Sequence, residues 1–539
     1  MEEPRTIRCA VLCAAHTLPH WQGQAIRHLI ELAGVELVAV GIPQTGRQHT
    51  PRTGFRGYLN HRSHHLISVR AAAPEDLSDL LAPLPNVELR TVDTRSISEE
   101  LAPFAPDLVI SFLPPLEQER GDPKLPIWQF VLNERGLGKD GMPAMDVKFT
   151  TLKDMPVQLV RVDRLGMVEA TFPLRDEDLN PTIDPWLLGA AWLPSILISK
   201  LRRQPTEPFD KPSIDSHYKP ELQRPISSLV ALWLNLEYRR LKASKLPTPE
   251  TGAWNIGILH QPITELLQDT PNMNVRWLPA PSEGNHRMEP FGYMAQDGQL
   301  NVLYRKRSVH SEQDIIARLR PKSDSVLKRS RSMLSTSASL TYPFVVERPD
   351  GAYAIIGYPH QRRTELFRVA STNDGMDHIK VLLNRALTNP TLTQFEDRWW
   401  LFGMDPDASG SVLLAYYADA FDGTYHPHHL NPLKVARSGC RPAGAFFSHE
   451  GTLWRPVMDA SDPDIPAVVL SRVIRLTPNE FEEEPGNRIS GFRGTSYAHG
   501  VRTLNAMGDI TLIDGVRDAT GERKRPKADP EKRRRSKHR

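Results

Sequence analysis

The C-terminal half of the chain repeats one short phrase five times, and this repeat is the strongest constraint on its fold. Each copy begins at a residue followed by proline, or at a counterpart without it, and reaches an acidic turn about seven residues later. An apolar or aromatic run follows the turn, which is typical of a β-hairpin. The copies read EPFGYMAQDGQLNVLY (289–304), YPFVVERPDGAYAIIG (342–357), NPTLTQFEDRWWLFG (389–403), RPAGAFFSHEGTLWRPV (441–457) and RTLNAMGDITLIDG (502–515).

The spacing of these hairpins favours a five-bladed β-propeller. Their turns recur at intervals of roughly 50 residues, which is the spacing of propeller blades. A propeller arranges small antiparallel sheets radially and leaves only short, protected edges. A β-sandwich, the alternative, gives no reason for the same phrase to return at such intervals. We therefore predict an all-β propeller over residues 251–518.

The first half of the chain alternates strand-like and helix-like runs. IRCAVLCA, VELVAVGI and PDLVISFL are rich in β-formers, and LPHWQGQAIRHLIEL carries apolar residues at helical spacing. This alternation predicts an α/β domain over residues 1–203, with a parallel sheet covered by helices and any ligand at the carboxyl ends of the strands. The stretch CAAHTLPHW after the first strand contains no glycine, which disfavours a dinucleotide-binding loop.

Two segments have the composition of connections rather than domains. Residues 204–250 are rich in proline and charge, and we expect a linker that encloses one helix at ISSLVALWLNLEYRRLKAS. Residues 519–539 include ERKRPKADPEKRRRSKHR, with ten Lys/Arg against three Asp/Glu, and are expected to be a disordered basic tail.

The tail also accounts for the sign of the net charge. The whole chain has a formal charge of +3, so the rest of it is near −4 and is not expected to bind nucleic acid. For the tail itself two alternatives stay open. It makes weak contact with nucleic acid or an anionic membrane, or it is solvated and has no specific partner.

Composition predicts a cytoplasmic protein, with a peripheral position at the inner face of the membrane as a further option. No run of about 18 apolar residues occurs, and the acidic start MEEPRTIRCAVLCAAH does not resemble a signal peptide. Three cysteines cannot build a disulfide framework, so we expect Cys9, Cys13 and Cys440 to be buried thiols.

No metal or cofactor is expected. HPHHLNP places His426, His428 and His429 close together, but the flanking residues suit a surface turn and no carboxylate stands at ligand spacing.

The residues before the four prolines of the repeat are candidates for a shared site. They are Glu289, Tyr342, Asn389 and Arg441. The innermost strand of each blade lines the central channel, so the repeat predicts that these side chains form one ring. Proline biases the residue before it toward extended backbone, which would fix their direction. A carboxylate, a phenol, an amide and a guanidinium suit a polar ligand; the alternative is that they only hydrogen-bond between blades.

Several phrases in this half carry a resemblance to a known family. They are WNIGI, WLPAP, EPFGY, YPFVVE, NPTL, RWWLF, RPAG, LWRPVMD, SRVIRLTPNEFEEEP and TLNAMGDITLIDG. From about 254 to 516 the chain resembles the propeller domain found at the N-terminus of plant glucosamine inositolphosphorylceramide transferases and in bacterial polysaccharide-locus proteins. That propeller is similar to five-bladed glycosidases of the arabinanase and invertase type, which use funnel carboxylates as acid and as base or nucleophile.

The resemblance implies three funnel carboxylates, and this sequence departs from that pattern. Glu289 stands where aspartate is expected, Asn389 replaces a second aspartate, and Tyr358-Pro359 lacks the third acid. Glycoside hydrolysis needs two carboxyl groups, so it is not expected unless Asp405, Asp459 or Asp462 supplies the acid from a loop. Transfer from an activated donor needs only one base, with cations for the leaving phosphate.

We therefore predict a sugar-transfer site in the funnel. Glu289 would act as the base, with Asp459 as the second candidate catalytic residue. The predicted substrate-binding residues are His286, Arg287, Tyr342, Asn389, Arg441 and Arg455, the arginines as anion ligands. The expected partners are a nucleotide sugar or sugar phosphate and a glycan or lipid-linked acceptor. The alternative for Arg455 and Asp459 is that they form a structural ion pair between blades.

The first half resembles a formyltransferase-like domain that often precedes this propeller in bacterial proteins. LPHWQGQAIRHLIE, PDLVISFL and LGAAWLP carry the likeness. Active formyltransferases need an Asn-x-His pair and a distant aspartate. Here Asn133 is followed by Glu134 and Arg135, and Asp163 is the only counterpart of the aspartate, so we expect a degenerate domain.

These observations favour a sugar-transferring or sugar-binding protein of cell-surface glycan or glycolipid biosynthesis. Two alternatives stay open. One is a non-catalytic carbohydrate-binding scaffold, and the other is a formyltransferase that acts on an amino sugar.

Overall fold

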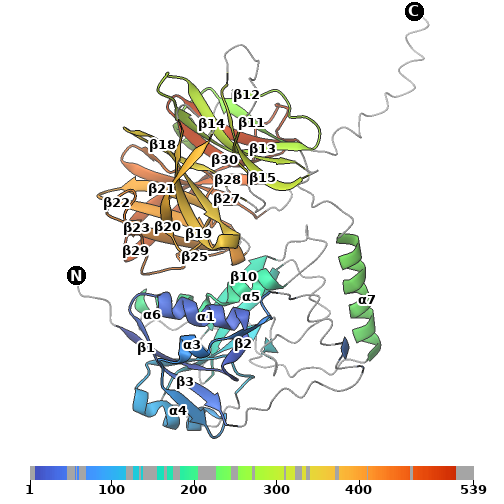
Figure 1. Ribbon diagram of the computed structural model, residues 1–539, viewed down its shortest axis with the longest axis vertical. Coiled ribbons are helices and arrows are strands. Elements are labelled where there is room, and N and C mark those ends of the chain that lie inside the picture. Colours follow the sequence, from blue (N-terminus) through green and yellow to red (C-terminus); the bar gives the residue numbers. More distant parts are fainter. Residues whose placement is uncertain are drawn as a thin grey trace, which may run out of the picture.

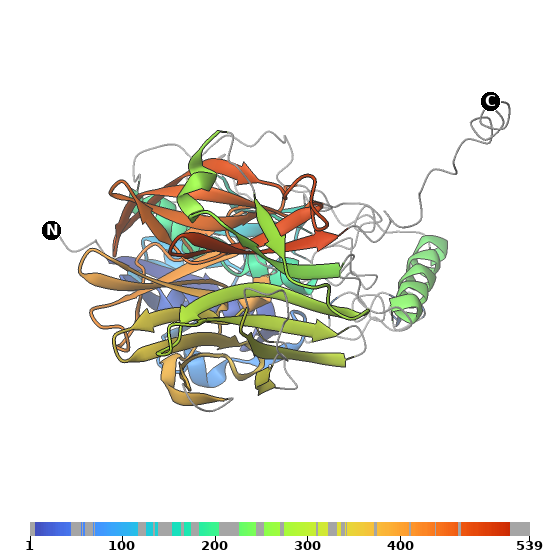
Figure 2. The same ribbon diagram turned by 90° about the horizontal axis from the view of Figure 1, so that it is seen from above.

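The protein is described by a computed structural model in which an α/β domain and a β-propeller lie against each other (Figure 1). Seen from above, the propeller overlies the α/β domain (Figure 2). The structure describes residues 6–44, 55, 58–59, 68, 70–116, 125–132, 135–137, 154–162, 167–173, 183–203, 226–243, 253–269, 274–308, 311–321, 331–335, 340, 342–370, 375–408, 411–436, 438–461 and 465–517.

The α/β domain is built on one mixed sheet with the strand order β10-β9-β7-β6-β1-β3-β5. The strands from β5 to β7 run parallel, whereas β9, β10 and the short β8 pair antiparallel. The prediction of a parallel sheet in this domain is confirmed. The strands are β1 (Ile7–Leu12), β3 (Val35–Pro43), β5 (Asn86–Leu89), β6 (Leu108–Ser111), β7 (Ile127–Leu132), β8 (Arg135–Gly136), β9 (Asp154–Arg161) and β10 (Met167–Pro173).

Helices cover both faces of this sheet, which explains why β1 is apolar and fully buried from Cys9 to Leu12. Cys9 and Val11 share a core with helices α1, α5 and α6, whereas Ala10 and Leu12 share a core with α4. Strands β2 and β4 form a small antiparallel pair, and α1 begins directly after β2. The bounds are β2 (Thr17–Pro19), α1 (His20–Glu31), β4 (Pro74–Asp76), α3 (Ser78–Leu81), α4 (Thr94–Leu101), η1 (Ala102–Phe104), α5 (Asp184–Ala190), α6 (Leu193–Arg203) and α7 (Ile226–Ala243).

The three cysteines are buried free thiols, as predicted. Burial raises the pKa of Cys9 and of Cys13 to about 12, and that of Cys440 to about 11. They therefore stay protonated and act as small core residues.

The propeller has five antiparallel sheets, and the prediction of five blades is confirmed. Blade 1 is β13 (Asn285–Met294), β14 (Leu300–Ser308), β15 (Ser311–Leu319) and β16 (Arg331–Ser335). Blade 2 is β17 (Phe344–Arg348), β18 (Gly351–Tyr358), β19 (Arg363–Val369) and β20 (Met376–Leu383). Blade 3 is β21 (Thr388–Phe395), β22 (Arg398–Met404) and β23 (Val412–Ala418), with β24 (His426–Pro427) and β25 (Lys434–Val435). Blade 4 is β26 (Phe447–His449), β27 (Thr452–Asp459), β28 (Ala467–Thr477) and β29 (Glu480–Ile489).

Blade 5 closes the ring with strands from both ends of the propeller. It consists of β30 (Gly500–Met507), β31 (Ile510–Arg517), β11 (Ala253–Leu259) and β12 (Val275–Trp277). β11 pairs antiparallel with β31 from Ala253 opposite Arg517 to Leu259 opposite Thr511. Strands β13, β17, β21, β26 and β30 are the innermost strands, and contacts join β30 to β13, β13 to β17 and β17 to β21.

Bulges interrupt three of the innermost strands, and two of these bulges contain candidate site residues. The pairing shifts between Met288 and Phe291, between Thr388 and Thr391, and between Val501 and Leu504. Within two of these bulges Glu289 and Asn389 have φ angles of 57° and 52°. The predicted extended backbone before proline is therefore wrong for both residues, because the bulge requires a left-handed residue there. Such a conformation is strained for a residue with a Cβ atom.

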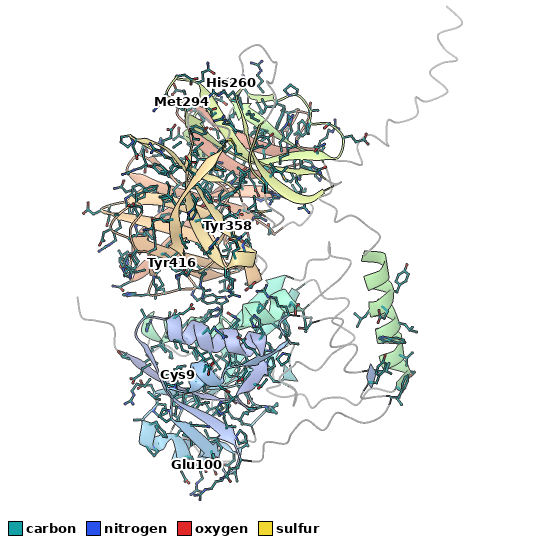
Figure 3. All side chains as sticks on the ribbon, viewed as in Figure 1. Cys9, Glu100, His260, Met294, Tyr358 and Tyr416 are labelled. Atoms are coloured by element: carbon teal, nitrogen blue, oxygen red, sulfur yellow. The ribbon has the colours of Figure 1, made fainter. Side chains whose placement is uncertain are left out.

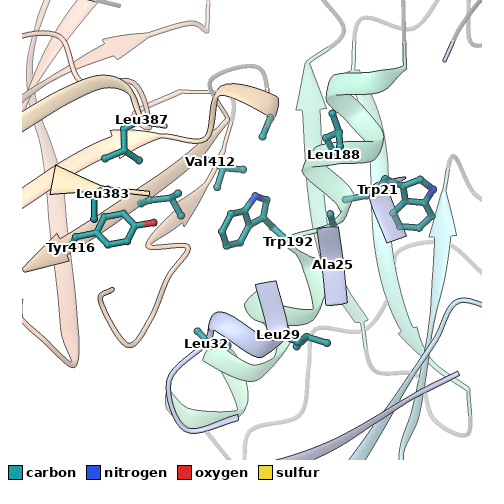
Figure 4. Packing of buried hydrophobic residues seen from close by; sticks show 14 of the residues in the cluster. Trp21, Ala25, Leu29, Leu32, Leu188, Trp192, Leu383, Leu387, Val412 and Tyr416 are labelled. Atoms are coloured by element: carbon teal, nitrogen blue, oxygen red, sulfur yellow. The ribbon is translucent and has the colours of Figure 1, made fainter. Parts of the chain in front are cut away.

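The two domains share a continuous apolar core (Figure 4). Trp192, between α5 and α6, lies between Leu188 on its own side and Val412 and Tyr416 of blade 3. Tyr416 lies on the side of the propeller that faces the α/β domain (Figure 3). The docking therefore buries side chains of both domains.

Polar contacts fix the orientation of Trp192 in this interface. Its Nε1 donates a hydrogen bond to Asp405 Oδ2 at 2.7 Å, and its ring stacks on His28 with centroids 3.6 Å apart. The Arg385 guanidinium lies 5.5 Å from the centroid of the indole. Burial, followed by the charge of Arg385, holds the pKa of His28 well below its ordinary value, so the stacked imidazole is neutral.

Helix α7 lies in the stretch where the helical pattern predicts one. The flanking linker residues 204–225 and 244–250 lie outside the described residues, as does the basic tail after residue 517. Within the described part of the chain, no helix combines the length and apolar character needed to cross a membrane.

Candidate functional site

The four residues that precede the prolines lie on neighbouring blades, and contacts between the blades connect them. Arg441 Nη2 lies 3.6 Å from Glu289 Oε1. Asn389 Nδ2 donates to Pro442 O at 2.9 Å, and the Tyr342 hydroxyl hydrogen-bonds to Thr391 Oγ1. Thr391 Oγ1 in turn donates to Asn389 O at 3.2 Å, so these contacts join the four residues into one network, which we call the ring because its members come from successive blades.

Glu289 is the most unusual member of this ring. Its side chain is fully buried, and neither carboxylate oxygen accepts a hydrogen bond from another described residue. Two guanidinium groups lie beside it, with Arg305 Nε at 3.4 Å from Oε2 and Arg441 Nη2 at 3.6 Å from Oε1. A buried carboxylate without hydrogen bonds is costly, so both oxygens favour a ligand that donates hydrogen bonds to them.

Tyr342 and Asn389 add neutral polar groups. Tyr342 is fully buried, and burial, with the Glu289 carboxylate as a smaller contribution, raises the pKa of its hydroxyl far above the usual range. It is therefore a neutral hydroxyl at every physiological pH. Asn389 is 2% exposed, and its Oδ1 accepts no hydrogen bond from another described residue.

Two charged residues at the ring, Arg305 and Asp514, were missed by the reasoning from sequence. Arg305 belongs to β14 and is paired there with Met288. Asp514 belongs to β31, next to the end of the fifth repeat, where it could have been singled out as an acid inside an apolar strand. The repeat alone could not single out Arg305, because it lies after the matching phrase.

Asp514 ties the bulges of two blades together. One of its oxygens accepts from the Glu289 backbone N–H at 2.9 Å, and the other accepts from the N–H groups of Arg502 at 3.0 Å and Thr503 at 2.8 Å. Burial raises the pKa of Asp514, whereas these hydrogen bonds act in the opposite direction. The side chain thus holds the strained backbone of Glu289 from the neighbouring blade.

Replacing Asp514 with alanine is expected to lower the free energy of unfolding by about 2 to 3 kcal/mol, because three backbone N–H groups lose their acceptor. The matched control is Asp509→Ala in the turn of the same hairpin, where the exposed side chain should change stability by less than about 0.5 kcal/mol. Urea denaturation of both variants measures the difference. Equal effects would show that Asp514 carries no such role.

His286 and Arg287 flank Glu289 in the sequence but contact other groups. His286 is 5% exposed, and its Nδ1 accepts from the Trp254 backbone N–H at 3.4 Å. Arg287 Nη1 donates to Pro279 O at 2.8 Å and to Asn255 Oδ1 at 3.3 Å. Both side chains thus link β13 to blade 5 and its connections.

Arg455 lies in a buried ion pair inside blade 4. Its Nε and Nη2 donate to the two oxygens of Glu483 at 2.8 Å each, and Nη2 also donates to Gly439 O at 2.7 Å. The alternative pairing of Arg455 with Asp459 is wrong, because the two residues lie four positions, or about 13 Å, apart along β27. Each finds its partner on β29 instead, Glu483 for Arg455 and Arg488 for Asp459.

Asp459 is held by three donors. Arg488 Nε donates to it at 2.6 Å, Ser438 Oγ at 2.7 Å and the Ser461 N–H at 3.0 Å. Burial alone would raise the pKa of Asp459, but the hydrogen bonds, first that of Arg488, bring it well below its ordinary value. A carboxyl group of this kind is a poor proton donor.

The depressed pKa predicts how stability depends on pH. Since the folded-state pKa of Asp459 lies below the unfolded value of 3.8, its stabilisation is complete above that value and is lost as the pH falls through the folded-state pKa. Asp459→Asn should therefore be less stable than the parent at about pH 6, and the two melting temperatures should converge toward about pH 2. A constant difference across this range would contradict the assignment.

The remaining candidate acids lie elsewhere. Asp405 accepts from Trp192 and from the Asp407 N–H in the domain interface, and burial raises its pKa. Asp462, together with Asn133 and Asp163 of the first domain, lies outside the described residues.

The histidine cluster of blade 3 is engaged in local contacts. His428 Nδ1 accepts from the Leu430 N–H at 3.0 Å, and His429 hydrogen-bonds to Asn479. In the part of the chain that the structure describes, no three His, Cys, Asp or Glu side chains are grouped so that they could hold a metal ion.

The fold and the ring define a five-bladed propeller protein with a buried polar site where its blades meet. Residues 277–500 match the sequence model of the family described as Glucosamine inositolphosphorylceramide transferase 1, N-terminal. The resemblance of the propeller to that domain is confirmed by this match.

Curated relatives of the same description align with about half of the chain. The protein of Oryza sativa subsp. japonica is 26% identical over 333 residues, which cover 54% of this chain and 44% of the relative. The Arabidopsis thaliana protein is 24% identical over 288 residues, covering 51% and 36%. The chain thus spans less than half the length of these relatives.

Solved structures similar to part of this chain include a glycoside hydrolase and an arabinanase. The family 117 enzyme Zg3597 of Zobellia galactanivorans has a TM-score of 0.33 and 11% identity, covering 44% of this chain and 87% of that enzyme. The α-L-arabinanase of Cellvibrio cellulosa has a TM-score of 0.28 and 11% identity, covering 37% and 77%.

Proposed function

We propose that the protein transfers a sugar in the biosynthesis of a cell-surface glycan or glycolipid, and that it does so in the propeller funnel around Glu289. The observation that carries the proposal is the buried Glu289 carboxylate, which has two guanidinium groups at 3.4 Å and 3.6 Å and accepts no hydrogen bond from the residues that the structure describes. The match of this propeller to the transferase-associated family supports a role in glycolipid synthesis.

In this proposal Glu289 accepts the proton of the acceptor hydroxyl. Arg305 and Arg441 stabilise the charge that develops on the leaving phosphate. Tyr342 donates its hydroxyl proton to Thr391, so its oxygen accepts a hydrogen bond from a sugar hydroxyl, and Asn389 Oδ1 accepts a second one. The donor is a nucleotide sugar or sugar phosphate, and the acceptor is a glycan or a lipid-linked molecule.

The distribution of carboxylates favours transfer over hydrolysis. Hydrolysis needs a second carboxyl group as acid or nucleophile. Asp514 is a buried carboxylate in contact with the Glu289 backbone, and it uses both oxygens on backbone N–H groups. Asp459 pairs with Arg488, so we place it, with Arg455, outside the proposed site.

The proposal includes a cytoplasmic location, at the inner face of the membrane where a lipid-linked acceptor would lie. The α/β domain is proposed to be a degenerate formyltransferase-like domain, on the basis of its parallel sheet and the missing Asn-x-His pair.

A thermal-shift experiment on the whole chain tests the proposed site. UDP-glucose, UDP-N-acetylglucosamine and glucose 1-phosphate are the probes, because a molecule that binds only the native state raises the melting temperature by mass action. We expect at least one probe to stabilise the parent protein and the control Glu450→Gln, whose side chain is exposed in the turn of blade 4. The same probe should stabilise Glu289→Gln much less.

The outcomes separate transfer from binding. An equal shift in Glu289→Gln and in the parent would place the ligand outside the funnel. Binding without release of UDP in the presence of a glycan acceptor would favour the carbohydrate-binding scaffold instead. No shift with any probe would contradict the proposed donor class.

A further inference from the structure

A second polar cavity lies between the two domains. It has a volume of about 330 Å³ and is lined by α1 and Glu75 on one side and by three propeller connections on the other. Those connections are η4 (Pro359–Gln361) with Arg362, residues 384–386, and η5 (Pro406–Ala408) with Asp405. Small-molecule sites of about 300–1,000 Å³ occur preferentially at domain interfaces.

On the α/β side the cavity presents an oriented histidine. His20 Nδ1 lies 2.8 Å from Glu75 Oε2, and Arg27 Nη2 lies 2.6 Å from Glu75 Oε1. The carboxylate favours the tautomer with the proton on Nδ1, which leaves Nε2 of the neutral ring as an acceptor. Gln24 Nε2 donates a long hydrogen bond of 3.5 Å to that nitrogen. A hydroxyl group that enters the cavity can replace the amide as donor to Nε2 and accept from the released amide.

On the propeller side, too, charged side chains of the lining form ion pairs with opposite charges. Arg385 pairs with Glu31 of α1, and Arg362 lies 3.8 Å from Asp407. Asp407 also pairs with Arg70 at 2.6 Å. The exposed amide of Asn384 lies at the same wall. Altogether the lining carries four carboxylates, three guanidiniums and one imidazole.

This balance indicates the chemistry of the ligand. A phosphate or a nucleotide would meet four carboxylates and would have to displace them from their guanidinium partners. A neutral polyol carries hydroxyl groups that both donate and accept, so it can bind to the imidazole, the amides and the paired charges without disrupting them. The volume suits a molecule of about one sugar ring.

We infer that the interdomain cavity is a second ligand site, one that takes an uncharged polyhydroxylated molecule such as a monosaccharide or a cyclitol. The inference goes beyond sugar transfer in the funnel and does not depend on it. Ala386 of the cavity precedes Asn389 of the ring by three residues, which corresponds to at most about 11 Å of extended chain. The two sites are therefore close to each other along this connection.

Calorimetric titration of the full chain with glucose, galactose and myo-inositol tests this inference. The cavity variants are His20→Leu and Asn384→Leu, the second of which changes an exposed side chain and should leave the fold intact. The matched control is Asn479→Leu, an exposed asparagine in the turn between β28 and β29. Glu289→Gln reports on the funnel in the same experiment.

We expect at least one of the three probes to bind, and its affinity to fall at least fivefold in both cavity variants. Asn479→Leu and Glu289→Gln should bind it as the parent does. Loss of binding in Glu289→Gln with retention in the cavity variants would move the site to the funnel. Failure of all three probes, or binding of inorganic phosphate or glucosamine alone, would overturn the inference.

Discussion

Replacement of Arg455 by methionine is expected to lower the free energy of unfolding of the propeller by about 3 to 5 kcal/mol, the range for breaking a buried ion pair by removal of one partner. The Arg455 side chain has no exposed surface, and that of Glu483 is 7% exposed. Without the guanidinium, Glu483 keeps Lys434 at 3.0 Å as its cation, and Gly439 O loses its donor.

The same sheet offers a matched control. Arg472 pairs with Glu484 at 2.9 Å, one residue along β29 from Glu483, but both side chains are about half exposed. Arg472→Met should therefore cost no more than about 1 kcal/mol. Urea denaturation followed by circular dichroism measures both variants. A small effect of Arg455→Met, comparable to that of Arg472→Met, would contradict the structural role of the buried pair.

A double replacement refines this experiment. Arg455→Met combined with Glu483→Leu removes both charges, so no carboxylate is left buried with a partner missing. We expect the double variant to be more stable than Arg455→Met alone. If it is less stable, the penalty comes from lost packing rather than from the unpaired charge.

Trp192→Ala is expected to separate the two domains, at a cost of about 3 to 5 kcal/mol. The indole is 4% exposed, stacks on His28 and donates to Asp405. Its removal opens a cavity in the shared core and leaves the Asp405 carboxyl with one donor fewer. Calorimetry should then show two thermal transitions where the parent unfolds with its domains coupled.

Trp192→Phe is the control for this second prediction. It keeps an aromatic ring against His28 but lacks the Nε1–H donor and part of the indole volume, so its effect should be nearer to about 1 to 2 kcal/mol. Limited proteolysis gives an independent readout, because undocked domains expose the residues that the interface buries. A Trp192→Ala protein that melts in one transition at the parent temperature would contradict the role of this side chain.

The repeated phrase was sufficient to predict the propeller and the ring. A residue followed by proline recurs in the same place in successive blades, and the closure of the blades converts this periodicity into proximity, as for Glu289 and Arg441. The alternation of strands and helices was likewise sufficient for the parallel sheet, since that pattern has few compact arrangements.

The charged partners could not be predicted, because each depends on a register between distant strands. Arg455 meets Glu483 from β29, and Trp192 meets Asp405 from a domain 213 residues away in sequence. From position in the chain alone, Arg455 could have paired with Glu483 or with Asp459. The left-handed backbone at Glu289 was missed for a related reason, since a bulge is set by pairing between strands and overrides the local preference before proline.

The closure of blade 5 has a consequence for biosynthesis. β11 is made early, whereas its partner β31 ends at Arg517, so the edge of β11 stays unpaired on the ribosome until almost the whole propeller has emerged. At synthesis rates of about 5–20 residues per second this interval lasts on the order of 10 to 50 seconds. The backbone of Glu289 acquires its acceptor Asp514 only when β31 arrives. A nascent chain therefore has no complete funnel, and an edge strand open for this long is the natural point for a chaperone to bind.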